Sequence, residues 1–80
     1  MNTMKQRVVA ILKNFGIEES AISDNAHIVK DLGFDSLDVV DLMMQLEQEF
    51  GIAIPDDDYN KITTVSTLLT YLNEHQAIPA

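Results

Sequence analysis

The sequence contains no cysteine and no tryptophan, and it has only five basic residues against thirteen acidic ones. Without cysteine, the chain has no disulfide, no thiolate metal site and no cysteine nucleophile. The two histidines, His27 and His75, are too few for a zinc site of the ordinary ligand types. We therefore expect no metal site, and stability must come from the packing of a chain that is 46% hydrophobic.

The chain also lacks a long apolar run, so the sequence predicts neither a signal peptide nor a membrane span, and we expect a cytoplasmic protein. The formal net charge of −8 repels phosphate backbones and anionic lipid headgroups. Nucleic acids and membrane surfaces are therefore poor partners, and a basic protein surface is the expected one. A chain of 80 residues has room for one domain, which we place at residues 1–80 and expect to be monomeric.

The acidic residues are concentrated in the middle of the chain. Residues 18–58 contain twelve of the thirteen acids and a single basic residue, Lys30, whereas residues 1–17 contain three basic residues and no acid. A surface for a basic partner is therefore expected in the middle of the sequence. The alternative is that these acids form a solvated face that keeps the protein soluble.

Apolar residues at helical spacing predict three long helices, over residues 4–15, 36–50 and 65–72. Pro55 followed by three aspartates predicts a short helix between the last two, because proline and acids favour the first turn of a helix. No segment shows the alternation of a strand. The sequence therefore predicts an all-α four-helix bundle with three long helices, a short third helix and a long first loop over residues 16–34.

The first loop is unusually long for a small bundle, and loops of this length are often functional. Residues 18–23 are expected to add a helical turn, and Thr64 is a candidate N-cap for the last helix. Four apolar residues are expected to hold the loop against the core: Ile17, Ile22, Ile28 and Leu32.

The longest predicted helix, residues 36–50, has two apolar faces. On a helical wheel at about 100° per residue, five residues fall on the core side: Val39, Leu42, Met43, Leu46 and Phe50. Leu37, Val40 and Met44 fall on the opposite side, with charged and polar residues along both edges. An apolar strip with a charged rim is typical of a docking surface for a partner. The alternative is that the long loop or the short third helix covers this strip.

Ser36 lies where the long loop meets this helix, shortly after Gly33, which permits a sharp turn. Either Asp35 or Ser36 can cap the helix by accepting a hydrogen bond from a backbone N–H group. A helix N-terminus also suits a phosphate, because its free N–H groups and its dipole favour an anion. A serine hydroxyl at this place could therefore carry a phosphodiester, and the alternative is that Ser36 is only an N-cap.

Ser36 is a poor candidate for a catalytic nucleophile. No histidine lies near it in the sequence, and no Gly-x-Ser-x-Gly motif surrounds it. The flanking carboxylates of Asp35 and Asp38 would oppose a developing oxyanion. We therefore expect no catalytic residue and no enzyme activity.

The segment Asp31-Leu-Gly-Phe-Asp-Ser-Leu-Asp-Val-Val-Asp-Leu-Met-Met-Gln-Leu-Glu-Gln-Glu-Phe50 closely resembles acyl carrier protein. The segments Ile54-Pro55-Asp-Asp-Asp58 and Lys61-Ile-Thr-Thr-Val65 extend the resemblance to roughly residues 4–76. The resemblance implies a four-helix bundle with a short third helix. It also implies that Ser36 carries a 4′-phosphopantetheine arm, which a separate phosphopantetheinyl transferase transfers from coenzyme A. The thiol at the end of the arm would hold an acyl group as a thioester.

The resemblance further implies that the helix after Ser36 is the main recognition element. The residues at the implied docking positions are Asp35, Leu37, Asp38, Val40, Asp41, Met44 and Glu47. The implied partners are the phosphopantetheinyl transferase and acyl synthases, reductases and transferases with basic docking patches. We expect the process to be fatty-acid biosynthesis. The alternatives are a carrier for a specialised lipid or polyketide pathway, or an acidic helical adaptor without a prosthetic group.

A carrier of fatty chains must also shield them from water. Seven apolar residues are candidates to line an expandable interior: Leu42, Met43, Leu46, Ile54, Ile62, Val65 and Leu68. The alternative is that these residues form a simple core with no role in binding a ligand.

Overall fold

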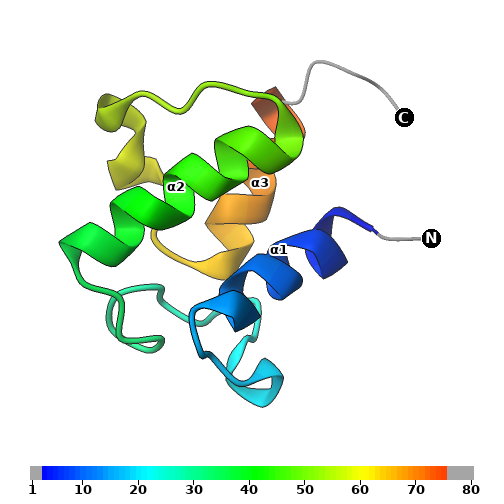
Figure 1. Ribbon diagram of the computed structural model, residues 1–80, viewed down its shortest axis with the longest axis vertical. Helices are drawn as coiled ribbons and strands as arrows, with labels where there is room; N and C mark the ends of the chain where they lie inside the picture. Colours follow the sequence, from blue (N-terminus) through cyan, green and yellow to red (C-terminus); the bar gives the residue numbers. More distant parts are fainter. Residues whose placement is uncertain (1–2, 76–80) are drawn as a thin grey trace.

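Three long helices, α1 (Met4–Asn14), α2 (Ser36–Phe50) and α3 (Val65–His75), pack around one apolar core in the computed structural model, which describes residues 3–75. α1 contacts both α2 and α3, and α2 runs across the bundle in front of α3 (Figure 1). Among the described residues, no helix combines the length and the apolarity that a membrane crossing requires.

Two short 3₁₀ helices lie between the long ones, η1 (Glu19–Ala21) and η2 (Asp56–Lys61). η1 is the helical turn expected in the first loop, and η2 is the predicted short third helix. η2 is a 3₁₀ helix and not an α-helix, as is common for such short segments. Over the part of the chain that the structure describes, β pairing is limited to an isolated antiparallel bridge between His27 and Thr64. The predicted all-α bundle with a short third helix is therefore confirmed.

The first loop is held against the core as expected. Ile22, Ile28 and Leu32 are buried in the same cluster as the helix residues, and Ile17 packs against that cluster while partly exposed. The connection between α1 and α2 is therefore an ordered part of the fold.

The predicted N-cap of the last helix is also confirmed. Thr64 caps α3, because its hydroxyl oxygen accepts a hydrogen bond from the N–H group of Thr67 at 3.1 Å.

The C-terminal end of α2 is fixed by α1. The Arg7 guanidinium forms an ion pair with the Glu49 carboxylate at 2.7 Å and donates a hydrogen bond to the Glu49 carbonyl oxygen at 2.8 Å. The same guanidinium lies 4.5 Å from the centre of the Phe50 ring. A cation at the last carbonyl groups of a helix stabilises it, because those groups carry partial negative charge. Arg7 thereby fixes the direction of α2 from its C-terminal end.

η2 is anchored to both long helices beside it. The Tyr71 hydroxyl donates a 2.6 Å hydrogen bond to Asp58, and the Glu47 carboxylate accepts a 2.6 Å bond from the Ile54 N–H group just before η2. Burial raises the pKa of Tyr71 to about 12, with a further contribution from its bond to Asp58. That bond is also the main reason that the pKa of Asp58 is lowered. η2 therefore depends on contacts with α2 and α3 for its position.

Candidate functional site

The N-terminal end of α2 is closed by two aspartates. The Asp35 carboxylate accepts a hydrogen bond from the Asp38 N–H group at 2.8 Å, and the Asp38 carboxylate accepts one from the Asp35 N–H group at 3.3 Å. This reciprocal arrangement is a capping box. Of the two candidates for the N-cap, Asp35 and Ser36, the structure therefore identifies Asp35.

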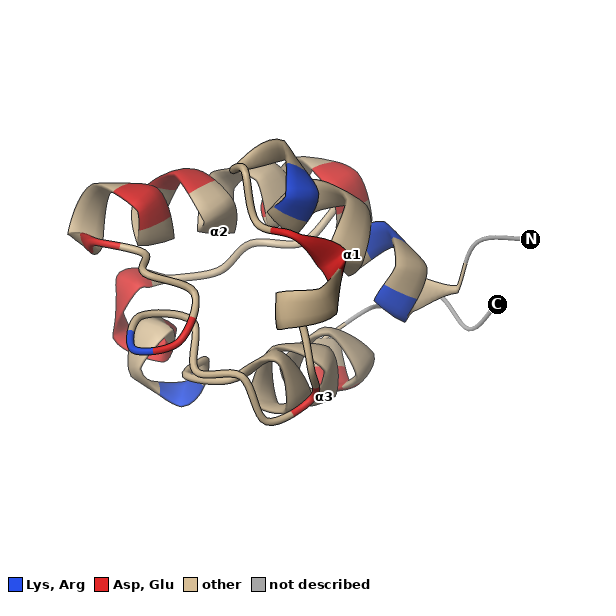
Figure 2. Cartoon of the chain, turned by 90° about the horizontal axis from the view of Figure 1, so that it is seen from below, with Lys and Arg blue, Asp and Glu red and all other residues tan. Residues whose placement is uncertain are grey.

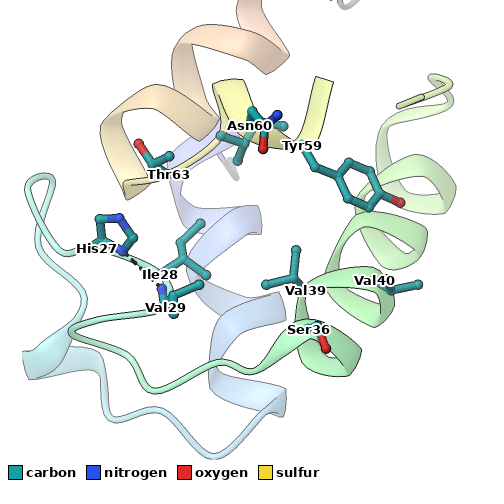
Figure 3. Close-up of a pocket in the computed structure, with 10 residues that line it drawn as sticks. His27, Ile28, Val29, Ser36, Val39, Val40, Tyr59, Asn60 and Thr63 are labelled. Carbon is teal, nitrogen blue, oxygen red and sulfur yellow. Dashed lines mark hydrogen bonds between the residues drawn. The ribbon is translucent and has the colours of Figure 1, made fainter. Parts of the chain in front are cut away.

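Ser36 is the first residue of α2 and is exposed. Its side chain lies on the first turn of the helix, and its hydroxyl oxygen points away from Ile28 and Val39 (Figure 3). Among the hydrogen bonds between described residues, none involves the Ser36 hydroxyl group. Because Asp35 caps the helix, the Ser36 hydroxyl is available for modification by an enzyme.

The backbone that leads into α2 is tightly placed. Gly33 has a φ of +80°, a conformation that residues with a side chain rarely adopt. The next residue, Phe34, is buried, and its ring centre lies 4.9 Å from that of Phe15. This aromatic contact anchors the chain two residues before Ser36. The serine is thus exposed, while the backbone next to it is fixed.

A pocket of about 360 Å³ opens beside Ser36, between α2, η2 and the loop that precedes α2 (Figure 3). Six of its residues are apolar or aromatic: Ile28, Val29, Val39, Val40, Tyr59 and Ile62. Its polar residues are His27, Ser36, Asn60 and Thr63. A mostly apolar pocket of this kind suits an aliphatic chain, because burial of such a chain removes apolar surface from water.

This pocket differs from the interior that the sequence suggested. Of the seven candidate lining residues, Ile62 borders the pocket, and the other six are buried in the core. Helical periodicity correctly placed Leu42, Met43, Leu46, Val65 and Leu68 on buried helix faces, whereas Ile54 and Ile62 lie in the irregular segments before and after η2. It could not locate a pocket formed by a loop and a 3₁₀ helix, because neither element has a regular apolar spacing.

The second apolar face of α2 is exposed, as the sequence predicts. Leu37, Val40 and Met44 keep 78%, 43% and 51% of their surfaces accessible. Neither the first loop nor η2 buries them, so the alternative of a covered strip is wrong for these three residues. Among described residues, the large hydrophobic side chains this exposed are these three and Val29 of the pocket.

The acidic residues around this face differ in their exposure and in their hydrogen bonds. Asp35 and Asp41 are exposed, whereas Asp38 and Glu47 are half-buried. Asp41 accepts a hydrogen bond from Gln45 at 3.4 Å, and Glu47 is bonded to the N–H group of Ile54. Glu47 therefore has a structural role in addition to the docking role that the resemblance implies, and no pattern in the sequence indicated that contact.

The positive charges of the protein are largely neutralised within the fold. Four ion pairs join described residues: Lys5–Asp24, Arg7–Glu49, Lys13–Glu19 and Lys61–Asp58. The acids of the first turns of α2, namely Asp35, Asp38 and Asp41, belong to none of these four pairs. Figure 2 shows acidic residues along α2 and basic residues on α1. Part of the negative charge that these ion pairs leave uncompensated therefore lies close to Ser36 and to the exposed apolar residues of α2.

Residues 6–72 match the protein family described as PP-binding, phosphopantetheine attachment site. The chain belongs to this family. Membership is consistent with the resemblance to acyl carrier protein and shows that the domain is a site for covalent attachment of 4′-phosphopantetheine. The protein is therefore a phosphopantetheine carrier, and the geometry around α2 can be compared with what such a group requires.

The residues at the start of α2 fit this carrier role. Attachment through a phosphodiester needs an accessible hydroxyl group, which Ser36 provides. The backbone N–H groups of Ser36 and Leu37 lie in the first turn, where a helix has no internal acceptors and favours an anion. No cluster of three or more potential metal ligands exists among residues 3–75. The fit to the carrier group rests on the hydroxyl, the helix end and the adjacent apolar pocket.

Proposed function

We propose that Ser36 carries the phosphopantetheine arm and that the protein uses it to hold acyl intermediates for partner enzymes. The observation that supports this most strongly is the division of roles at the start of α2. Asp35 caps the helix, so the Ser36 hydroxyl is exposed and free of hydrogen bonds to other described residues. The family match explains why such a hydroxyl is needed.

When attached, the arm supplies a terminal thiol that binds an acyl group as a thioester. The protein contributes position and recognition. Ser36 anchors the arm at a fixed helix end, and the absence of cysteine leaves no second thiol to capture the acyl group. The apolar pocket beside Ser36 would shelter an aliphatic chain from water. The protein itself performs no chemical step in this scheme, and we propose that it is not an enzyme.

The docking face proposed for partner enzymes comprises the residues that the resemblance implies: Asp35, Leu37, Asp38, Val40, Asp41, Met44 and Glu47. Its three apolar side chains are exposed, and Asp35, Asp38 and Asp41 take part in none of the ion pairs between described residues. Such a face suits basic patches on the phosphopantetheinyl transferase and on acyl synthases, reductases and transferases. Complementary charge accelerates association without demanding tight binding, and a carrier must also dissociate.

We propose fatty-acid biosynthesis as the process, supported by the apolar lining of the pocket. A carrier for a specialised lipid or polyketide pathway would use the same attachment point and the same docking face. Mass spectrometry of the acylated forms from the native host separates the two, since saturated aliphatic thioesters support fatty-acid biosynthesis. Predominantly oxidised or branched cargo would support the specialised pathway.

The attachment itself is tested by incubating the protein with coenzyme A, magnesium and a phosphopantetheinyl transferase, followed by intact mass measurement. The wild type should gain the mass of one phosphopantetheinyl group, and Ser36→Ala should gain none. A wild type that gains no mass, under conditions that load a known carrier, would instead support an acidic helical adaptor that works through its docking face alone.

A further inference from the structure

His27 makes an unusual set of hydrogen bonds in the loop before α2. Its ring nitrogen Nδ1 accepts hydrogen bonds from the N–H groups of Val29 at 3.2 Å and Lys30 at 3.1 Å. Its own N–H group donates to the Asp31 carboxylate at 2.7 Å. The arrangement is similar to a capping box, with an imidazole in the place where a serine or aspartate oxygen normally accepts the bonds.

The protonation state of His27 determines whether these bonds exist. A ring nitrogen that accepts two N–H groups carries no proton, so the ring is neutral with its proton on Nε2. Protonation of the ring would place an N–H group on Nδ1, opposite the N–H groups of Val29 and Lys30. Both hydrogen bonds would then be lost, and three donors would face one another.

The turn capped by His27 leads directly into the attachment site. The N–H group of Leu32 donates to the His27 carbonyl oxygen at 3.0 Å, and the N–H group of Phe34 donates to the Ile28 carbonyl oxygen at 3.2 Å. Phe34 is the buried anchor that precedes Ser36 by two residues. His27 and Ile28 also line the same pocket as Ser36. A loosened turn would therefore disturb both the presentation of Ser36 and one wall of the pocket.

The elements around the His27 turn and the pocket carry other charged groups. They are Lys30 and Asp31 in its own turn, the Lys5–Asp24 pair toward α1, the Lys61–Asp58 pair of η2, and Asp35 and Asp38 at the start of α2. Across the pocket lies Tyr59, whose pKa is raised by burial, so it remains neutral in acid. The second imidazole, His75, stacks on Tyr71 at the end of α3.

We propose that His27 is a positioning residue for the modification of Ser36, and that its neutral ring holds the turn that presents this serine. The rate at which the transferase loads the carrier then depends on pH through the protonation of His27 in the carrier, and not only through the transferase. This inference rests on the proposed function of Ser36, but the state of the turn can be measured without any loading.

The first test measures the turn directly by NMR. At pH 7.5 the ring of His27 should be the Nε2–H tautomer, and the amides of Val29 and Lys30 should be protected from hydrogen exchange. After correction for intrinsic exchange rates, their protection should fall about 10-fold in His27→Leu, which lacks the acceptor. His27→Asn, whose side-chain oxygen can accept the same bonds, should retain most of it. An Nδ1–H tautomer in the wild type, or equal protection in all three proteins, would overturn the proposal.

The second test compares loading rates of the same three proteins with one transferase at pH 7.5 and 5.5. The ratio of wild type to His27→Asn should be near one at pH 7.5 and fall about 3-fold or more at pH 5.5, because only the histidine loses its acceptor. His27→Leu should load about 3-fold or more slowly than His27→Asn at both values. All three proteins keep His75, which removes it from the comparison.

The two possible failures give different results. A wild type that is not loaded at any pH contradicts the proposed function of Ser36, whatever the NMR shows. A wild type that loads normally, with a ratio to His27→Asn that is independent of pH, contradicts the role of His27 alone. If His27→Leu loads like His27→Asn at pH 7.5, any pH effect arises from the charge of the imidazolium and not from the turn, which also overturns the proposal.

Discussion

Two neighbouring residues at the start of α2 have separate roles. Asp35 caps the helix, and Ser36 presents a free hydroxyl group. A serine in the N-cap position would use its hydroxyl oxygen to accept a backbone hydrogen bond. Here Asp35 occupies that position and bonds to the N–H group of Asp38, while Ser36 lies one residue later. Ser36 therefore lies at a helix end that favours an anion, and its hydroxyl group is free of hydrogen bonds to other described residues.

The first prediction concerns the cap. Asp35→Ala removes the acceptor for the Asp38 N–H group and should lower the free energy of unfolding by about 1 kcal/mol. Asp35→Asn keeps an oxygen acceptor and should lose clearly less. Urea unfolding monitored by circular dichroism measures both. Equal losses in the two variants would show that the carboxylate contributes through its charge and not as a cap.

The sequence predicts Ser36 as the attachment residue, but it does not indicate the hydrogen bonds of His27. Ser36 is part of a recognisable motif, and its place at a predicted helix start carries physical meaning. The contacts of His27 depend on a turn in a loop and on a bridge to Thr64, which lies 37 positions along the chain. No spacing rule connects two such residues. An isolated histidine in a loop gives little signal before the fold is known.

At the level of the element, α2 combines a buried and an exposed apolar face. Leu42 and Leu46 are fully buried, whereas Leu37 is largely exposed on the other side. Helical periodicity predicts both faces, because each side chain is placed by its angle around the helix axis. It does not predict the bond from Ile54 to Glu47, since that contact depends on the path of the following loop.

The second prediction uses two adjacent methionines that lie on opposite faces of α2. Met43 is completely buried and Met44 is half exposed. Met43→Ala should lower the free energy of unfolding by about 2–5 kcal/mol, because it leaves a cavity in the core. Met44→Ala should change it by less than about 0.5 kcal/mol.

The same pair separates stability from docking. Met44→Ala should weaken association with the phosphopantetheinyl transferase, measured as an increase in KM for the carrier, although the fold is intact. A loss of stability in Met44→Ala as large as in Met43→Ala would show that the second face is covered in solution. An unchanged KM would exclude Met44 from the docking face.

The third prediction concerns the anchor of η2. Tyr71→Phe removes the hydrogen bond to Asp58 and should lower the urea midpoint at pH 7. The folded state favours the protonated phenol, whose pKa is raised from 10.0 to about 12. The stabilisation is therefore complete below pH 10 and is lost as the pH rises from 10 to about 12.

The difference in midpoint between wild type and Tyr71→Phe, measured from pH 7 to pH 12, isolates this effect from the titration of other groups. It should remain constant up to about pH 10 and then shrink. A difference that persists unchanged at pH 12 would mean that the hydroxyl contributes by packing and not through its proton. Amide hydrogen exchange within η2 should be faster in Tyr71→Phe than in the wild type, because the variant lacks the bond to Asp58.

At the scale of the whole molecule, three of the five basic residues lie on α1, whereas acidic residues surround the start of α2. Three basic residues of α1 are paired with acids of the loop and of the C-terminal end of α2. Asp35, Asp38 and Asp41, around the proposed attachment residue Ser36, belong to none of the ion pairs between described residues, so they add negative potential there. The sequence indicated this from the uneven distribution of acids, but the pairing of the cations required the fold.

The fourth prediction follows from this separation. The value of kcat/KM for loading should fall as salt rises from about 10 mM to 150 mM, since the screening length shortens from about 30 Å to 8 Å. Neutralising an acid of the docking face, as in Asp41→Asn, should reduce both the rate at low salt and the dependence on salt. Glu18→Gln, with the same change of charge in the loop after α1, should have a smaller effect. Equal effects of the two variants would show that net charge, and not the face on α2, determines association.

Locating the phosphopantetheinyl group after loading tests most directly whether Ser36 is the attachment residue. Tandem mass spectrometry of the wild type should place the added mass on fragments that contain Ser36. Fragments that contain only the other serines, Ser20, Ser23 and Ser66, should be unmodified. Added mass on any of those three residues, or a Ser36→Ala protein that is loaded as fully as the wild type, would show that Ser36 is not the specific attachment residue.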